Sequence, residues 1–336
     1  MTRHHKHERL LKIVDSFSRV TVAVMGDLVA DEFVFGEIAR VSREAPVLIL
    51  KYRDRTIVPG GGANAIYNLA ALGVNVLPIG VVGDDEPGRA LLKAFRQKHI
   101  PVSGIVKVKN YPTVTKTRIL AGQSHSARQQ VVRIDREPDR ELDAKTLRSL
   151  QVAARQYARA ADGLLISDYG YGAASPTMFS ALRISNALSG ITVTLDSRYR
   201  MLEFPGVTAA TPNEPEVEAA LGFKIGDDIA RLHAAGKALM QKLKLDSLLI
   251  TRGKDGMVSF ARGRKPIEIP IHGTDQVADV TGAGDTVIAT FTAALATGAD
   301  AEDAARLANY AGGIVVMKRG TATASADELR HALEHS

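Results

Sequence analysis

The sequence predicts an α/β fold: a doubly wound, mostly parallel sheet flanked by helices, with a small antiparallel β lid. In the second half of the chain, short β-rich runs alternate with stretches of helical apolar spacing, as in a parallel sheet covered on both faces. Two other stretches, residues 33–59 and 104–134, are rich in Val, Ile, Thr and Tyr and contain turn residues. We expect these stretches to form the lid, as a subdomain of one domain that comprises residues 1–336.

The expected elements follow in chain order. Apolar periodicity identifies the helices, and the strands are short runs rich in β-branched residues. The first half supplies a strand at 20–25, a helix at 63–72, a strand at 76–82 and a helix at 87–99. The second half supplies strands at 163–167, 191–195, 207–210 and 247–250, and helices at 175–188, 214–221, 227–243, 287–295 and 301–317.

Composition excludes several classes of protein. The chain has 336 residues, of which 45% are hydrophobic and 24% charged, values typical of a globular protein with a large core. No apolar run approaches the roughly 20 residues that span a membrane, and the basic first 12 residues lack the apolar segment of a secretory signal. We therefore expect a cytoplasmic protein without a membrane partner. The absence of cysteine excludes disulfides and thiolate nucleophiles or metal ligands.

The positive charge does not indicate a nucleic-acid partner. Half of the net charge of +6 comes from residues 1–12, so the rest of the chain is only mildly basic. There is no Trp, and the Lys and Arg residues are scattered among acidic ones instead of lining one face with aromatic residues between them. A small anionic substrate accounts for the surplus equally well.

Polar residues follow several of the predicted strands. Because the carboxyl ends of parallel strands lie at one edge of the sheet, where open α/β folds bind ligands, we expect a site at this edge. The residues concerned are Gly26-Asp27, Asp168, Asp196, Thr211 to Asn213, and Thr251 to Gly253.

A glycine loop, Asp-Val-Thr-Gly-Ala-Gly-Asp at 279–285, directly precedes an expected helix. At a helix N-terminus, the N–H groups of Gly282, Ala283 and Gly284 would stabilise an anion such as a phosphoryl group in transfer. A carboxylate at Asp285 would repel that anion unless it removes a proton from an attacking hydroxyl. The alternative is an ordinary helix cap after a tight turn. The gathering of polar residues at the strand ends favours the site.

A second glycine turn precedes the helix expected at 63–72. It reads Gly60-Gly61-Gly62-Ala63-Asn64. Three consecutive glycines allow a ligand to approach the backbone closely, and Asn64 offers both a donor and an acceptor to a hydroxyl. The alternative is a flexible turn with a capping Asn.

Together the two segments resemble the two signature motifs of the ribokinase-like (PfkB) sugar kinases. Gly60 to Asn64, followed by Gly73 and Gly83, resembles the first motif, and 279–285 resembles the second, more than 200 residues later. Other segments are similar to one branch, the D-glycero-β-D-manno-heptose 7-phosphate kinases of lipopolysaccharide-core precursor synthesis, and the similarity covers about residues 20–325. These segments are Gly26-Asp27 with Asp31, RVSREAP at 40–46, PTVTKTRIL at 112–120, Ser167 to Tyr169, Thr211 to Asn213 with Glu216, and Thr251-Arg252.

This resemblance implies a ribokinase-like kinase domain that uses ATP to phosphorylate the anomeric hydroxyl of the heptose 7-phosphate. Asp285 would be the general base, and the amides of Gly282, Ala283 and Gly284 would stabilise the transferred group. The sugar would be held by Asp31, Gly61, Gly62 and Asn64, with help from Asp27 and Asp168.

The resemblance also implies where ATP and Mg²⁺ bind. Asn213 and Glu216 match an Asn-x-x-Glu element that positions both, with Glu216 holding the metal through water. Read from the residues alone, Glu216 could equally be an ordinary acid in the first turn of its helix. Further residues expected at the nucleotide are Glu214, Thr251, Gly253 and Gly256, with Asn309 and Gly313 near adenine.

One position departs from the branch. Heptose kinases tend to show Ser-Asp-Tyr-x-Lys-Gly, whereas residues 167–172 read Ser-Asp-Tyr-Gly-Tyr-Gly, so Tyr171 replaces a cation. A substrate that already carries a phosphate needs cations elsewhere, and the two lid stretches supply them. We expect Lys116, Arg128 and Arg133 to hold the 7-phosphate in preference to Arg118, with Arg43 as a further candidate.

The resemblance carries expectations about assembly and product as well. A lid sheet with an exposed face suggests a homodimer through the lid. A monovalent cation, if one binds, would contact carbonyls near Asp279, Gly320 and Ser325. Bifunctional relatives add a nucleotidyltransferase domain with a His-x-Gly-His type element, which this sequence lacks, so we expect the 1,7-bisphosphate as product. The rival readings are another kinase of the same fold and a non-catalytic nucleotide or sugar-phosphate sensor.

Overall fold

The computed structural model describes residues 3–122, 129–273 and 278–335. In this part of the chain the main sheet has nine strands, in the order β13-β12-β11-β10-β9-β8-β1-β4-β5. All neighbours are parallel except at one edge, where β12 runs antiparallel to both β11 and β13. The strands are β1 (Thr21–Gly26), β4 (Asn75–Gly83), β5 (Ile105–Val108), β8 (Gly163–Asp168), β9 (Thr192–Ser197), β10 (Ala209–Ala210), β11 (Ser247–Thr251), β12 (Met257–Ala261) and β13 (Ile267–Ile269).

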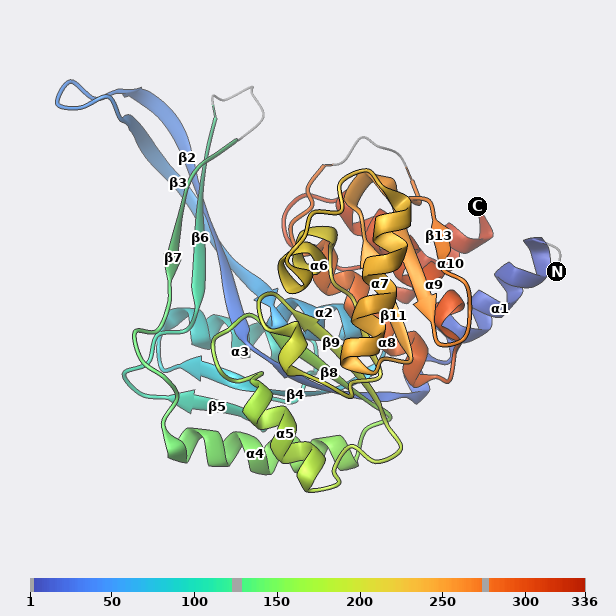
Figure 1. Cartoon of the computed structure of the whole chain (residues 1–336). Helices are drawn as coiled ribbons and strands as arrows, with labels where there is room; N and C mark the ends of the chain where they lie inside the picture. Colours follow the sequence, from blue (N-terminus) through green and yellow to red (C-terminus); the bar gives the residue numbers. More distant parts are fainter. Residues whose placement is uncertain (1–2, 123–128, 274–277, 336) are drawn as a thin grey trace.

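Helices cover both faces of this sheet (Figure 1). Alternate residues of β1 enter two different cores: Val22 and Val24 one, and Ala23 and Met25 the other, as expected for a strand buried on both sides. The first core is closed by α1 (Arg3–Asp15), α2 (Gly62–Ala71), α3 (Glu86–Gln97), α8 (Ala283–Ala296), α9 (Ala301–Val316) and α10 (Ala326–Glu334). The second is closed by α4 (Ala144–Arg159), α5 (Pro176–Ile184), α6 (Glu214–Leu221) and α7 (Ile229–Leu243).

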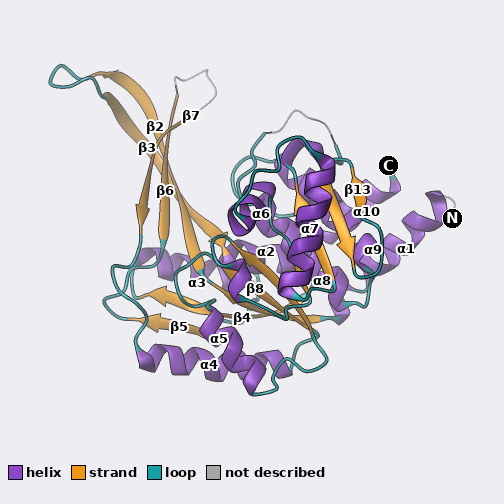
Figure 2. Ribbon diagram, viewed as in Figure 1, coloured by secondary structure: helices purple, strands orange, loops and turns teal. Residues whose placement is uncertain are grey.

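The lid is a separate four-stranded sheet in the order β3-β2-β6-β7 that projects from the body (Figure 2). Its strands are β2 (Leu28–Val41), β3 (Leu48–Gly61), β6 (Thr115–Gly122) and β7 (Gln129–Arg136). β2 and β3 form one antiparallel hairpin, β6 and β7 form another, and the two hairpins meet through the parallel pair β2–β6. The predicted fold class, a mostly parallel sheet with a small added sheet, is confirmed.

The stretch expected as the second half of the lid, residues 104–134, divides between the two sheets. β5 pairs with β4 in the main sheet, and the lid strands begin only at Thr115. Between them lies a turn with Asn110 at a φ of 54°, followed by Pro112, which carries no N–H and so cannot extend a ladder. β5 and β6 therefore belong to different sheets although both are β-rich.

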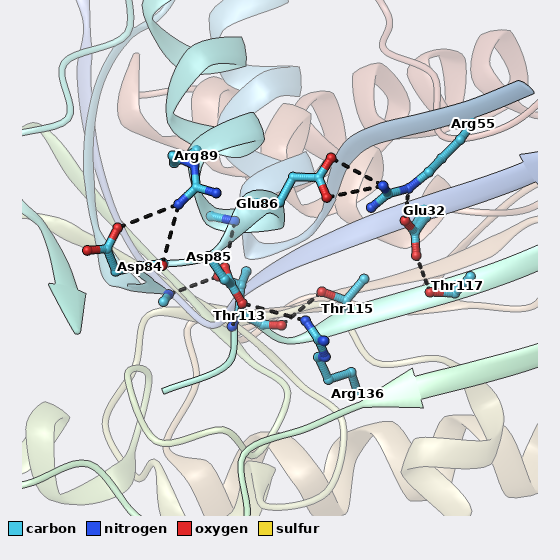
Figure 3. Close-up of polar contacts among 12 residues, drawn as sticks. Glu32, Arg55, Asp84, Asp85, Glu86, Arg89, Thr113, Thr115, Thr117 and Arg136 are labelled. Carbon is cyan, nitrogen blue, oxygen red and sulfur yellow. Dashed lines mark hydrogen bonds and ion pairs between the residues drawn. The ribbon is translucent and has the colours of Figure 1, made fainter. Parts of the chain in front are cut away.

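The base of the lid is fastened to α3 by charged and polar contacts (Figure 3). Arg55 of β3 bonds to Glu32 of β2 and also forms an ion pair with Glu86 of α3. Asp85 caps α3 by accepting from the Gly88 N–H at 3.0 Å, and it accepts from both the N–H and the hydroxyl of Thr113, which precedes β6. These contacts fix where the lid leaves the body.

None of the helices in the described ranges has the length and apolarity that crossing a membrane requires.

Candidate active site

Asp285 lies in the first turn of α8, directly after the glycine loop. Gly282 is the N-cap residue with a φ of 77°, and a Cβ at this position would lie 2.5 Å from Asn64 Nδ2, so only glycine fits. The N–H of Ala283 is bonded to the Val280 carbonyl at 3.2 Å. Gly284 is exposed and an added Cβ would meet nothing within 4 Å, so the helix N-terminus is accessible at this residue.

The Asp285 carboxylate is 4% exposed and accepts two hydrogen bonds. Asn64 Nδ2 donates to one oxygen at 2.9 Å, and the Tyr169 hydroxyl donates to the other at 2.8 Å. Burial raises the pKa of Asp285 to about 7, the nearby Asp31 adds to the rise, and the two donors and Arg198 oppose it. A carboxylate with a pKa near 7 is suited to general base catalysis at neutral pH.

A buried chain of side chains fixes the orientation of Asn64. The Thr286 hydroxyl donates to Asn68 Oδ1 at 2.9 Å, and Asn68 Nδ2 donates to Asn64 Oδ1 at 3.1 Å. The Asn64 amide must therefore present its Nδ2 to Asp285. The two glycine segments, far apart in sequence, meet in this network of α2 and α8 side chains.

The three glycines of the first turn are each closely approached by protein atoms. A Cβ at Gly60 would lie 2.4 Å from Asp31 Oδ2, and a Cβ at Gly61 would lie 3.2 Å from the Tyr169 ring. A Cβ at Gly62 would lie 2.9 Å from the Asp27 carbonyl. This turn brings Asp31, Tyr169 and the end of β1 together, and a ligand is not needed to explain its glycines.

Asp31 joins the lid to the body. It lies on β2, forms an ion pair with Arg118 of β6, and accepts from the Thr321 hydroxyl at 3.2 Å. Beside this junction is a pocket of about 670 Å³, here called the lid pocket, between the lid strands and the loops next to α8 and α9. Its lining includes Phe33, Arg118, Thr281, Arg319 and Thr321.

Asp27 and Asp168, expected to assist with the sugar, bind protein groups. Both oxygens of Asp27 accept backbone N–H groups of the loop after β8, from Tyr169, Tyr171, Ala173 and Ala174. Asp168 is 1% exposed, bonds to Arg200 and Ser197, and accepts from the Gly170 N–H at 3.0 Å. Both carboxylates therefore hold the loop that carries Tyr169.

The expected lid cations lie at very different places. Lys116 is near the site, with its Nζ 5.9 Å from the centroid of the Tyr169 ring, and burial lowers its pKa, as do Arg198 and Arg133. Arg133 is exposed and forms an ion pair with Asp135 at 2.8 Å. Arg43 lies in the turn between β2 and β3, and the stretch of β2 from Asp31 to this turn is about 33 Å long at about 3.3 Å per residue. Arg128 lies outside the described residues.

The expected Mg²⁺ and nucleotide residues gather at the ends of β10 and β11. Asn213 caps α6, and Glu216 completes a capping box, each side chain bonded to the other's backbone N–H at 2.9 Å. Asn213 also pairs with Thr251 in an isolated parallel bridge, and Glu214 accepts from Arg252 Nε at 2.6 Å. Burial raises the pKa of Glu216, against the effect of the Asn213 bonds and Arg198.

The remaining nucleotide candidates surround the turn after β11 and the strand beyond it. Gly253 and Gly256 bound that turn, and Gly256 packs against the carbonyl of Ile269. Asn309 of α9 donates to the Pro270 carbonyl at 2.8 Å, and Gly313 packs against the carbonyl of His272. Gly256, Asn309 and Gly313 therefore all contact residues 269–272, at and just after the end of β13.

The structure adds residues to the site that we did not single out from the sequence. Tyr169 was noted only as part of a similar segment, and Asn68, Thr286 and Thr321 were not noted. Arg198 follows β9 close to Asp196, whose pKa is raised well above its usual value by burial and by the nearby Glu216 and Asp285. Tyr171, at the position of the expected Lys, donates its hydroxyl to Glu137 at 2.5 Å, away from Asp285.

The fold and this site define a sugar kinase of the ribokinase-like class. Residues 28–328 match the pfkB family carbohydrate kinases, and the chain belongs to this family. Kinases of this family transfer a phosphoryl group to a carbohydrate hydroxyl.

Within the family, the chain is similar to proteins named bifunctional protein HldE. It is 39% identical to the one from Pelobacter propionicus over 326 residues, which are 95% of this chain and 65% of that protein. It is 40% identical to the one from Geobacter sulfurreducens over 311 residues, 92% of this chain and 62% of that protein. The chain thus spans less than two thirds of the length of these relatives.

Solved structures share the fold. Arabidopsis thaliana ribokinase, in a complex with ribose and ATP, superposes with a TM-score of 0.72 at 21% identity, covering 94% of this chain and 99% of the ribokinase. Escherichia coli phosphofructokinase-2, in a complex with fructose-6-phosphate, gives a TM-score of 0.76 at 17% identity, covering 94% of this chain and 98% of that enzyme.

Proposed function

We propose that the protein phosphorylates the anomeric hydroxyl of D-glycero-β-D-manno-heptose 7-phosphate, with ATP as donor, to give the 1,7-bisphosphate. The observation that carries the chemistry is the buried Asp285 at the N-terminus of α8, with a pKa of about 7. Asp285 takes the proton of the sugar hydroxyl, whose oxygen attacks the γ-phosphorus of ATP while the bond to ADP breaks. The N–H groups of Gly282 and Gly284 stabilise the charge on the moving phosphoryl group, whereas that of Ala283 is bonded to Val280. Similarity to the HldE proteins supports the choice of sugar.

The lid pocket supplies the cations that a substrate phosphate requires. Arg118 and Arg319 both line it, from the lid and the body respectively. Asp31 contacts Arg118 and Thr321 of this pocket, and Asn64 contacts Asp285, so sugar hydroxyls bound by both would extend from the pocket to the base. We therefore assign the 7-phosphate first to Arg118 and Arg319, with Lys116 next to Tyr169 as a further contact. This differs from the order expected from sequence, which placed Arg118 behind Lys116, Arg128 and Arg133.

The carboxylates near Asp285 fit Mg²⁺. Mg²⁺ commonly keeps several waters and is bound through one or two carboxylates and the substrate phosphates. Asp196 and Glu216 both have raised pKa values, and Asp196 owes part of its rise to Glu216 and Asp285. A bound divalent cation would relieve this repulsion. Glu216 would hold the ion through water, beside the ATP phosphates.

We also propose that two copies of the chain form a homodimer through the lid. Val41, Leu48, Tyr52, Val132 and Ile134 are exposed on the lid strands, with Tyr52 62% exposed. Val41 and Leu48 are register partners and so lie on the same face of the sheet. A homodimer through the lid would bury these side chains. Light scattering at micromolar concentration tests it, since the mass of a monomer would contradict the dimer.

The decisive experiment measures ADP formation with a panel of acceptors. The panel contains the heptose 7-phosphate, the same heptose without phosphate, ribose and fructose 6-phosphate. We expect the highest kcat/KM with the heptose 7-phosphate, and a ³¹P spectrum that shows the new phosphate on C1. Faster turnover of ribose or fructose 6-phosphate would reject the substrate, and no turnover of any acceptor would favour the sensor.

The phosphate contacts can be tested separately. Arg118→Ala should raise the KM for the heptose 7-phosphate about tenfold or more, because a charge-assisted contact to phosphate is lost. Lys51→Ala removes an exposed cation from β3 of the same lid and serves as control. If the two variants have the same KM, Arg118 does not contact the phosphate.

A further inference from the structure

Tyr169 makes three kinds of contact at the centre of the site. Its hydroxyl donates to Asp285 Oδ1 at 2.8 Å. Its ring lies against Gly61 on one side, and Lys116 Nζ lies 5.9 Å from the ring centroid. Its backbone N–H donates to Asp27 Oδ2 at 2.9 Å. Hydroxyl, ring and backbone are thus each held by a different element.

The loop behind Tyr169 is fixed by buried carboxylates. Asp27, 2% exposed, accepts N–H groups at Tyr169, Tyr171, Ala173 and Ala174, so one side chain from the end of β1 organises six residues of loop. Asp168 accepts the N–H of Gly170. Such an arrangement leaves the phenol little freedom to turn away from Asp285. The two buried carboxylates thus have their hydrogen-bond partners in this loop.

We propose that Tyr169 is a positioning residue for phosphoryl transfer, whose hydroxyl holds the Asp285 carboxylate ionised and aimed at the substrate hydroxyl. This inference rests on the proposed role of Asp285 as general base. One oxygen of Asp285 is taken by Asn64, which the Asn68 and Thr286 chain keeps in place. Tyr169 orients the other oxygen.

Hydrogen bonds to a carboxylate favour its charged form, so Tyr169 opposes the effect of burial on Asp285. The other charged groups that face Asp285 are Asp31 from the lid and Asp196 and Arg198 from the end of β9. Asp31 and Asp196 disfavour a further negative charge, and Arg198 favours it. Tyr169 and Asn64 act differently, because they donate hydrogen bonds directly to the carboxylate. Asn64 is also proposed to contact the sugar.

The test compares Tyr169→Phe with Tyr171→Phe, a matched loss of a hydroxyl two residues away on the same loop. In the wild type, kcat/KM should fall below about pH 7 as Asp285 takes up a proton. Tyr169→Phe keeps the ring on Gly61 but removes the donor. We expect the acid limb to move up by about one pH unit, which lowers kcat/KM about tenfold at pH 6 and little at pH 9. The hydroxyl of Tyr171 bonds to Glu137, so Tyr171→Phe should leave the acid limb of the pH profile unchanged.

The outcomes separate this inference from the proposed function. If Asp285→Asn abolishes turnover but Tyr169→Phe has the wild-type limb, Tyr169 does not act on Asp285 and the inference is wrong. The same holds if kcat/KM falls equally at all pH values, because a merely structural role would have that effect. If Asp285→Asn retains turnover, the assignment of the base itself is wrong. Thermal unfolding of each variant at pH 6 and 9 shows whether a change in activity reflects loss of the fold.

Discussion

Replacing the proposed base should stabilise the folded protein and slow catalysis strongly. Asp285 is 4% exposed, and its pKa is raised from 3.8 to about 7. Each pH unit of difference between the folded and unfolded pKa corresponds to about 1.4 kcal/mol, so the ionised carboxylate costs the folded state about 4 kcal/mol. Asn has the same shape and no charge. Its oxygen can accept from Asn64, and its amide can donate to the Tyr169 hydroxyl, which can also accept.

The size of this stabilisation depends on pH, whereas its sign does not. Because the folded pKa is the higher one, the folded state binds the proton more tightly, and its disadvantage grows as pH rises from 3.8 to about 7 and is constant above. Asp285→Asn should therefore raise the free energy of unfolding by about 4 kcal/mol at pH 8, but by only about 2 kcal/mol at pH 5. Removal of the general base should lower kcat by roughly 10² to 10⁴-fold.

Urea unfolding at the two pH values measures the stability, and ADP release measures kcat. Asp139→Asn, the same substitution at an exposed carboxylate, controls for the loss of one charge. An equal change in stability at pH 5 and pH 8 would refute the electrostatic reasoning, even if turnover were lost. Near-normal turnover would refute the assignment of Asp285 as base, even if the stability changed as expected.

Three further predictions concern other parts of the site. Gly60→Ala places a Cβ 2.4 Å from Asp31 Oδ2, so the KM for the sugar should rise and stability should fall by about 1 to 3 kcal/mol, as measured by initial rates and urea unfolding. Asp27→Asn removes a charge whose pKa is raised by burial, but it turns an NH₂ toward two backbone N–H groups that now donate to the carboxylate. The loss of these hydrogen bonds should outweigh the relief of the charge and lower the free energy of unfolding by about 1 to 3 kcal/mol; an unchanged urea midpoint would contradict this. Glu216→Gln should raise the Mg²⁺ concentration for half-maximal rate about tenfold, and a Mg²⁺ titration that overlays the wild type would exclude a role for Glu216 at the metal.

Local patterns in the sequence were sufficient to predict the α/β class and the two glycine segments. The helix after 279–285 and the helix after the first glycine turn both occur, and the parallel sheet follows from the alternation of elements. The boundary between lid and body was less visible, because β5 and β6 both contain β-branched residues and lie in one β-rich stretch. Their assignment to different sheets depends on partners elsewhere in the chain, which no local pattern records.

The candidate site was predictable in its residue types more than in their contacts. Asp27 and Asp168 follow strands, and the family resemblance implied that they help to hold the sugar, but an acid after a strand can equally accept N–H groups of a neighbouring loop. Arg43 is in a lid segment with the right composition, yet the length of the β2–β3 hairpin carries it far from Asp31. Tyr169 meets Asp285 across 116 positions of sequence. Such pairings become apparent only when the tertiary arrangement is known.

The continuity of β2 has a mechanical consequence. The strand begins buried beside the site, where Asp31 contacts Arg118 and Thr321, and it ends at Val41, exposed in the outer part of the lid. One strand, whose pairing with β3 shifts register after Phe35 and after Ile38, thus connects a residue proposed to hold the sugar with a surface about 33 Å away along the chain. Near the base of this strand, the ion pair between Arg55 and Glu86 attaches the lid to α3 (Figure 3). A displacement of the outer part of the lid would therefore be transmitted along β2 to Asp31, without a change in the packing of the core.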